Sequence, residues 1–171
     1  VDVLPQITVL KSAGVANVPE PGGNVTYTAQ VTNNSVENVT LTSLSDDRFG
    51  VLAGDADCQV GTVLAPNATC SFTFVGAVSG DAGDSHVNVV TAVAVDNEQN
   101  EATDDDDATV GFTDVLPVIN VVKTANPTSL DEPGGLVDFE VTVTNQSVEA
   151  VWLTSLVDDQ FGDVFGLSAD C

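Results

Sequence analysis

The chain has 171 residues, of which 26 are Asp or Glu and only three are Lys or Arg, so its formal net charge is −23. So acidic a chain repels phosphate backbones and anionic lipid headgroups, which excludes nucleic acid and membrane surfaces as partners. No apolar run approaches the length of a membrane span. A hydrophobic fraction of 43% is too high for a disordered acidic tail, so the charge belongs to a folded protein.

Alternation of apolar and polar residues recurs along the chain, with turn residues such as Pro, Gly, Asn and Asp between the alternating segments. The pattern predicts strands near 6–13, 25–32, 39–45, 60–64, 70–78, 86–95 and 106–113. About seven strands in a segment of this length are typical of an immunoglobulin-like sandwich. The predicted fold class is therefore all-β, an antiparallel sandwich.

The sequence repeats itself with an offset of 112 residues. Asp-Val-Leu-Pro at 2–5 returns at 114–117, and 28 of the 49 residues from Asp2 to Gly50 are identical to their counterparts. This predicts a complete repeat over 1–113 and the first half of a second over 114–171. Half a sandwich leaves strand edges open, so either the chain is a segment of a longer array or a neighbouring chain supplies the missing strands.

Tandem copies are typical of spacers, scaffolds and multivalent surfaces, because one active site rarely needs serial copies. The only histidine, His86, has no convincing serine or cysteine partner in the sequence, and no glycine-rich phosphate loop is present. We therefore expect a protein that is not an enzyme. The short linker around Pro117 favours a semi-rigid rod.

The cysteines and sequons point to an oxidising, extracellular compartment. Cys58 and Cys70 lie twelve residues apart and are expected to form a disulfide, whereas Cys171 occupies the place of Cys58 in the second repeat. Possible glycosylation sites are the Asn-x-Ser/Thr asparagines Asn24, Asn33, Asn38, Asn67 and Asn145.

Carboxylates are expected to gather at the two ends of the sandwich, where they offer the oxygen ligands that calcium prefers. One group would lie at the junction between repeats, and the other on the hairpin at the opposite end. The alternative is a solvated acidic surface adapted to high salt. The expected calcium ligands are Glu20, Asp46, Asp47, Asp81, Asp84, Asp114 and Glu149 at the junction, and Asp96, Asp104 and Asp106 at the opposite end.

Lys11 and Lys123 are the only lysines and occupy the same position in the two repeats. They share strand parity with apolar neighbours, so they are predicted to point inward, where an ammonium needs a carboxylate or amide partner. An ion pair or a snorkelling side chain is the expected arrangement. In some immunoglobulin-like surface modules such a pairing becomes an intramolecular isopeptide bond.

The segments Asp-Val-Leu-Pro at 114–117, Lys-Thr-Ala at 123–125 and Glu-Pro-Gly-Gly at 132–135 carry a resemblance. With Gly-Asp-Ser-His at 83–86, they make the chain similar to the tandem immunoglobulin-like repeats of large bacterial and archaeal surface proteins. The resemblance implies an exported, modular stalk or filament component stabilised by calcium. Its partners would be neighbouring repeats or other copies of itself.

The competing hypothesis is an adhesin whose loops bind a glycan or a protein. Such a site should show aromatic residues clustered on one set of loops. Aromatics make up only 5% of the chain, and the single tryptophan, Trp152, replaces Thr40 of the first repeat. The absence of a repeated aromatic site favours the structural role.

Overall fold

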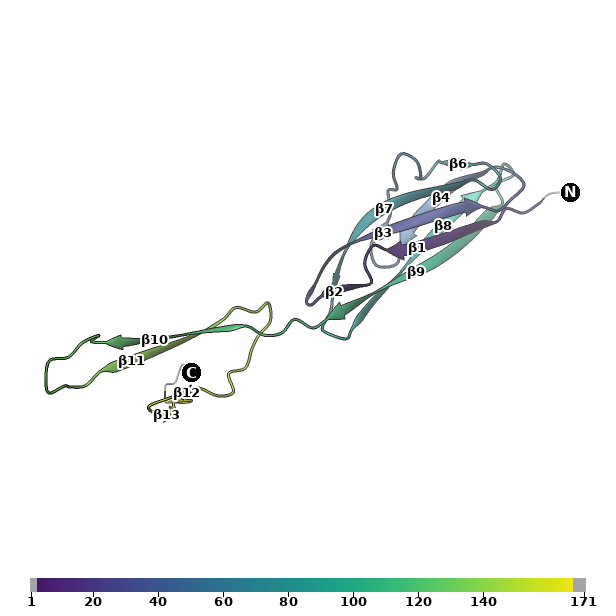
Figure 1. Cartoon of the computed structure of the whole chain (residues 1–171). Coiled ribbons are helices and arrows are strands. Elements are labelled where there is room, and N and C mark those ends of the chain that lie inside the picture. The colour runs from purple at the N-terminus through teal and green to yellow at the C-terminus, as the bar shows by residue number, and fades with distance from the viewer. Residues whose placement is uncertain (1–2, 168–171) are drawn as a thin grey trace. The chain divides into compact units, whose positions relative to one another are not determined.

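The computed structural model describes residues 3–167, which form two compact units that divide between Asp114 and Val115. The described residues are all-β and contain no helix, so no helix there is long and apolar enough to cross a membrane. Figure 1 labels the strands of both units except β5.

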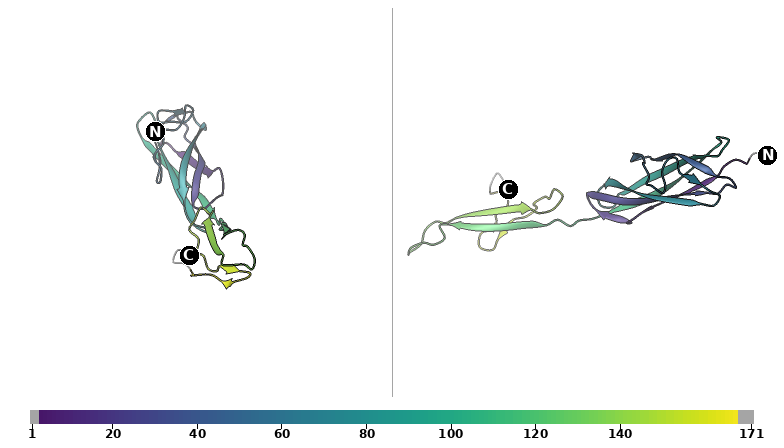
Figure 2. Two further views of the ribbon diagram at one scale, coloured as in Figure 1. Left: turned by 90° about the vertical axis from the view of Figure 1, so that its left-hand side faces the viewer. Right: turned by 90° about the horizontal axis from the view of Figure 1, so that it is seen from above.

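The first unit contains two facing sheets, as the layered strands in Figure 2 show. One sheet has the order β1 (Ile7–Ala13), β3 (Gly22–Asn33), β7 (Thr69–Ser79), and both pairings are antiparallel. β3 lies in the middle of this sheet because it pairs with β1 on one side and with β7 on the other. Alternation in β3 buries every second residue, namely Val25, Tyr27, Ala29, Val31 and Asn33.

The second sheet has the order β2 (Asn17–Pro19), β9 (Glu101–Thr113), β8 (Ser85–Val95), β4 (Val39–Asp46), β5 (Gly50–Val51). β6 (Val63–Leu64) also pairs with β4. The short β2 runs parallel to β9, whereas the other pairings are antiparallel. The result is an all-β, sandwich-like unit whose core lies between the sheets.

The buried face of β8 differs from the simplest interpretation of its sequence. Val87, Val89, Val93 and Val95 alternate, but the residues that face the core are Asn88, Val90, Ala92 and Ala94. Both faces of β8 carry apolar side chains, so the alternation alone does not choose between them. The chosen register brings one asparagine into the core.

β9 is longer than expected and begins at Glu101, so the hairpin loop covers only 96–100. The consecutive aspartates 104–107 therefore lie within a strand rather than in a loop at the end of the sandwich. Asp is depleted in strands, which is why the sequence favours a loop here. Alternation directs Asp104 and Asp106 to the same side of β9 as the buried Ala102 and Ala108.

The second unit reproduces the first half of the first. β10 (Ile119–Asn126) pairs with β11 (Asp138–Asn145), and β12 (Val157–Asp158) pairs with β13 (Gly162–Asp163). Ile119 lies opposite Asn145 as Ile7 lies opposite Asn33, so the register is the same after the offset of 112.

Residues 115–167 contain no counterparts of β7, β8 and β9, so the apolar face of the hairpin is uncovered. Phe139 is 46% exposed, whereas its counterpart Tyr27 is completely buried. The counterpart of β4 is a strand only at Val157–Asp158, because most of β4 pairs with β8 in the complete unit. A cavity of about 530 Å³ beside Lys123, Phe139 and Phe161 opens where a core would be.

Candidate functional site

A charged cluster lies in the core of the first unit, between β1, β4 and β8 (Figure 1). The ammonium of Lys11 donates a 2.7 Å hydrogen bond to Oδ2 of Asp46, and both side chains are fully shielded from solvent. Lys11 also donates a 2.7 Å bond to the backbone carbonyl of Asn88. The sequence prediction that Lys11 points inward toward a carboxylate agrees with this geometry.

Asn88 completes the cluster. Its Nδ2 donates a 2.8 Å hydrogen bond to the same Oδ2 atom of Asp46 that Lys11 binds. The residue is completely buried, and its Oδ1 atom has no hydrogen-bond partner among the described residues. Buried amide oxygens without a partner are uncommon and costly, so this atom requires an explanation.

The second carboxylate oxygen of Asp46 closes the turn after β4. Oδ1 accepts hydrogen bonds of 2.9 Å and 3.1 Å from the backbone amides of Arg48 and Phe49. Burial alone would raise the pKa of Asp46, but the hydrogen bond from Lys11, its charge and the two amides hold it below the ordinary value. A calcium ion at Asp46 would have to displace the buried ammonium of Lys11, so this geometry does not favour Asp46 as a calcium ligand.

Aromatic rings surround the lysine. Nζ of Lys11 lies 5.1 Å from the ring centroid of Tyr27 and 5.7 Å from that of Phe74. Burial lowers the pKa of Lys11, and the charge and hydrogen bond of Asp46 oppose this shift without cancelling it. The apolar setting therefore favours a neutral amine more than water does.

The second unit contains the same pair. Lys123 donates a hydrogen bond to Oδ2 of Asp158, and its ammonium lies 4.4 Å and 5.6 Å from the ring centroids of Phe139 and Phe161. Asp158 also accepts bonds from the amides of Gln160 and Phe161, as Asp46 does from its own turn. No asparagine of the described second unit takes the place of Asn88.

Asp104 and Asp106 bind backbone rather than a shared cation site. Oδ2 of Asp104 accepts a 2.7 Å bond from the amide of Val9, and Oδ2 of Asp106 accepts a 2.7 Å bond from the amide of Lys11. These amides lie on the edge of β1 that does not pair with β3. The two aspartates thus connect the sheets along one side of the sandwich.

Several of the remaining expected calcium ligands accept hydrogen bonds from backbone amides. Glu20 accepts a bond from the amide of Ala82, Asp84 from that of Asp81, and Asp47 from that of Val89. Asp96 binds within its own hairpin, Asp114 is the last residue of the first unit, and Glu149 belongs to the second. Within residues 3–167, no three His, Cys, Asp or Glu side chains are grouped so that they could hold a metal ion.

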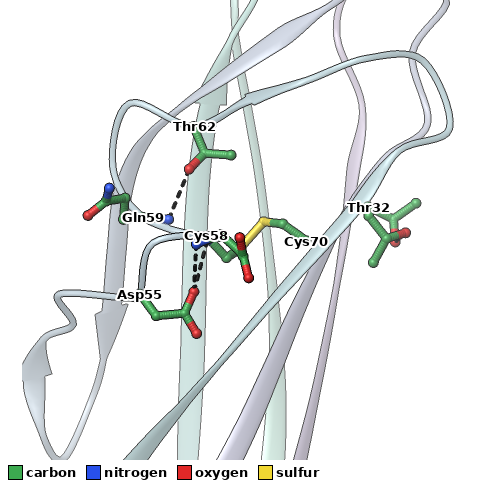
Figure 3. The surroundings of a disulfide bond; sticks show 8 residues. Thr32, Asp55, Cys58, Gln59, Thr62 and Cys70 are labelled. Atoms are coloured by element: carbon green, nitrogen blue, oxygen red, sulfur yellow. Dashed lines mark hydrogen bonds between the residues drawn. A yellow bond between two sulfur atoms is a disulfide. The ribbon is translucent and has the colours of Figure 1, made fainter.

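The expected disulfide is present. Cys58 and Cys70 are bonded, and they connect the loop after β5 to the start of β7 (Figure 3). The loop is ordered by Asp55, whose carboxylate accepts bonds from the amides of Asp57 and Cys58. Cys171 lies outside the described residues.

The five sequon asparagines differ in accessibility. Asn33 is completely buried, and its Nδ2, the atom that would carry a glycan, donates to the carbonyls of Glu37 and Leu64. The folded unit therefore has no room for a glycan at Asn33. The others are exposed, namely Asn24, Asn38, Asn67 and Asn145.

Asn88 is the residue that the sequence analysis missed. An isolated asparagine in a run of apolar residues, at 86–95, was the available indication, because a buried amide in a strand needs a polar partner. His86, by contrast, stacks on Phe49 with its Nε2 buried and without a hydrogen-bond partner in the described chain.

The sequence matches no protein-family model and no curated protein.

Proposed function

We propose that this chain is part of a repetitive extracellular surface protein, a stalk or filament built from immunoglobulin-like repeats in series. The observation that carries the proposal is the recurrence of one structural plan after 112 residues. The Lys11–Asp46 pair recurs as Lys123–Asp158, and the β1–β3 register recurs in β10–β11. Serial copies of one scaffold supply length and stiffness rather than a single reaction site.

The disulfide supports the extracellular assignment. A bridge persists in oxidising compartments, and closing a loop of twelve residues stabilises the folded state by about 3 kcal/mol. The net charge of −23 also suits a surface that must remain hydrated. Glycans at the exposed sequons would serve the same purpose.

The test of this proposal is a chain in which residues 59–113 are appended after Cys171, so that both repeats are complete. Trp152 is the only tryptophan and Tyr27 the only tyrosine, so each repeat has its own optical probe. Pulled from its ends, a stalk should show two separate unfolding events of similar force and length. A second repeat that stays unfolded, or that yields without resistance, would contradict the proposal.

The competing adhesin role is tested with the same protein. A glycan array or a pull-down in which a complete repeat binds one ligand specifically would replace the structural role. Calcium is tested by thermal unfolding with calcium or chelator at fixed ionic strength, because a ligand of the folded state raises the midpoint. A midpoint that follows only total salt would favour the solvated acidic surface.

A further inference from the structure

Three buried side chains from three strands converge in the first unit and have the complementary chemistry of an amine, an amide and a carboxyl group. Lys11 and Asn88 both donate to Oδ2 of Asp46, so the amine and the amide nitrogen lie within two hydrogen-bond lengths of each other. All three are at most 8% exposed. The described residues leave Oδ1 of Asn88 without a donor.

We propose that Lys11 and Asn88 are the site of a self-catalysed isopeptide bond that joins β1 to β8, with Asp46 as the acid and base of the reaction. This proposal does not rest on the proposed function. It assigns a covalent modification to a cluster that would otherwise bury an ion pair at considerable desolvation cost.

The first step is a proton transfer from Nζ of Lys11 to Oδ2 of Asp46, along the hydrogen bond of 2.7 Å. Desolvation lowers the pKa of Lys11 and favours this transfer, whereas the hydrogen bonds that Asp46 accepts hold the pKa of its carboxyl below the ordinary value and oppose it. The neutral amine is a nucleophile, whereas the ammonium is not.

The amine then attacks Cγ of Asn88. The new carbon–nitrogen bond forms as the C=O bond opens and negative charge develops on Oδ1, the atom that has no hydrogen-bond donor. Asp46, now protonated, lies beside the amide group and can donate its proton to the tetrahedral intermediate.

The intermediate collapses when the Cγ–Nδ2 bond breaks. Nδ2 takes the proton that Asp46 donates and leaves as ammonia while the C=O bond re-forms. The nitrogen of Lys11 then gives its second proton to Asp46, which can pass it on to the departing ammonia as ammonium. One amide is consumed and one is formed, so the reaction needs neither oxidant nor cofactor. The products are a Lys11–Asn88 isopeptide and one molecule of ammonia.

Asp46 itself is a poorer acceptor than Asn88. Its Oδ1 binds two backbone amides that stabilise the carboxylate form, and attack on its own carbon would need a second acid. The described residues place no other carboxylate within hydrogen-bond distance of Nζ of Lys11. The second unit provides an internal comparison, because Lys123 has the carboxylate but no amide from a strand equivalent to β8.

Intact-mass analysis of the purified, denatured and reduced chain tests the proposal. The expected mass is lower than the sequence mass by one ammonia. Trypsin should then fail to cut after Lys11 but still cut after Arg48 and Lys123, the only other Lys or Arg residues. The digest should contain segments 1–48 and 49–123 joined through Lys11 and Asn88.

Three variants sharpen the result. Lys11→Arg keeps the positive charge beside Asp46 but cannot form the bond, so the full sequence mass should return. Asn88→Asp keeps the shape of the acceptor, and its reaction would release water instead of ammonia. Lys123→Arg is the matched control in the second unit, and the loss of ammonia should persist.

If the chain without substitutions has the full sequence mass and trypsin cuts it normally after Lys11, the proposal is wrong. A loss of water from the chain without substitutions would also contradict the proposal, because the acceptor would then be Asp46. Pulling experiments give a second measurement. With the disulfide reduced, a bond between residues 77 apart should shorten the extended chain by roughly 260 Å.

Discussion

The carboxylate of Asp106 in β9 accepts a 2.7 Å hydrogen bond from the backbone amide of Lys11 in β1, a residue 95 positions earlier. β1 is an edge strand of its sheet, and edge amides left unpaired invite association with other strands. Asp104 and Asp106 satisfy two of these amides from the neighbouring sheet. The acidic run of β9 thus serves to close the sandwich.

Replacing Asp106 by Ala should destabilise the first unit by about 1–3 kcal/mol, because a partly buried amide loses its charged acceptor. Amide hydrogen exchange should locate the effect at Lys11, and urea unfolding followed through Tyr27 should give its size. Asp105→Ala is the control, since Asp105 lies on the exposed face of the same strand. Equal destabilisation by both substitutions would contradict this role for Asp106.

Gly76 of β7 allows the ring of Phe49 to pack directly on the backbone. A Cβ atom at Gly76 would lie 2.2 Å from that ring, closer than any real contact. Gly76→Ala should therefore cost about 1–3 kcal/mol through overpacking. Gly23→Ala is the matched control in the same sheet, because nothing lies within 4 Å of its added Cβ and its backbone suits any residue. A neutral Gly76→Ala in urea unfolding would rule out the packing argument.

The sequence predicted the parts of the fold that depend on local pattern. Val25, Tyr27, Ala29 and Val31 alternate with polar residues and are all buried as expected. Cysteine spacing predicted the disulfide, and the repeat predicted a second unit that copies the first half of the first. These features can be predicted from neighbouring residues or from a comparison of two segments of the sequence.

Other features depend on contacts between distant strands, and the sequence did not predict them. Asn88 enters the core because the register of β8 is set by β4 and β9, while its own two faces are both apolar. The hydrogen bonds from the amides of Val9 and Lys11 to Asp104 and Asp106 were not predicted, because nothing local reveals that β1 presents amides to these aspartates. The parallel contact of β2 with β9 has no local pattern either.

Reduction of the Cys58–Cys70 bridge should lower the stability of the first unit by about 3 kcal/mol, as expected for a closed loop of this size. Urea unfolding of a Cys58→Ser/Cys70→Ser variant, followed through Tyr27, measures this effect. The Trp152 signal should not change, because the tryptophan lies in the second unit. An unchanged Tyr27 midpoint would mean that the bridge constrains nothing in the unfolded chain.

Asp96 should make the β8–β9 hairpin sensitive to acid. Burial raises the pKa of its carboxyl, but hydrogen bonds from the side chain and amide of Asn100 and from the amide of Glu98 outweigh burial and hold the pKa below 3.8. A carboxyl whose pKa is lower in the folded state than in the unfolded state stabilises the fold at pH values above its unfolded-state pKa. This contribution is lost as the pH falls from about 3.8, the ordinary pKa, through the lower pKa of the folded state.

The measurement is an NMR titration of the Asp96 carboxyl carbon together with amide exchange at Glu98 and Asn100. The carboxyl should titrate below 3.8, and protection of the two amides should fall over the same pH range. Asp96→Asn keeps an oxygen acceptor but cannot titrate, so it should remove the pH dependence of amide protection while leaving the turn formed. If protection in this variant still follows pH as before, another group controls the hairpin, and the hydrogen bonds of Asp96 do not govern its acid sensitivity.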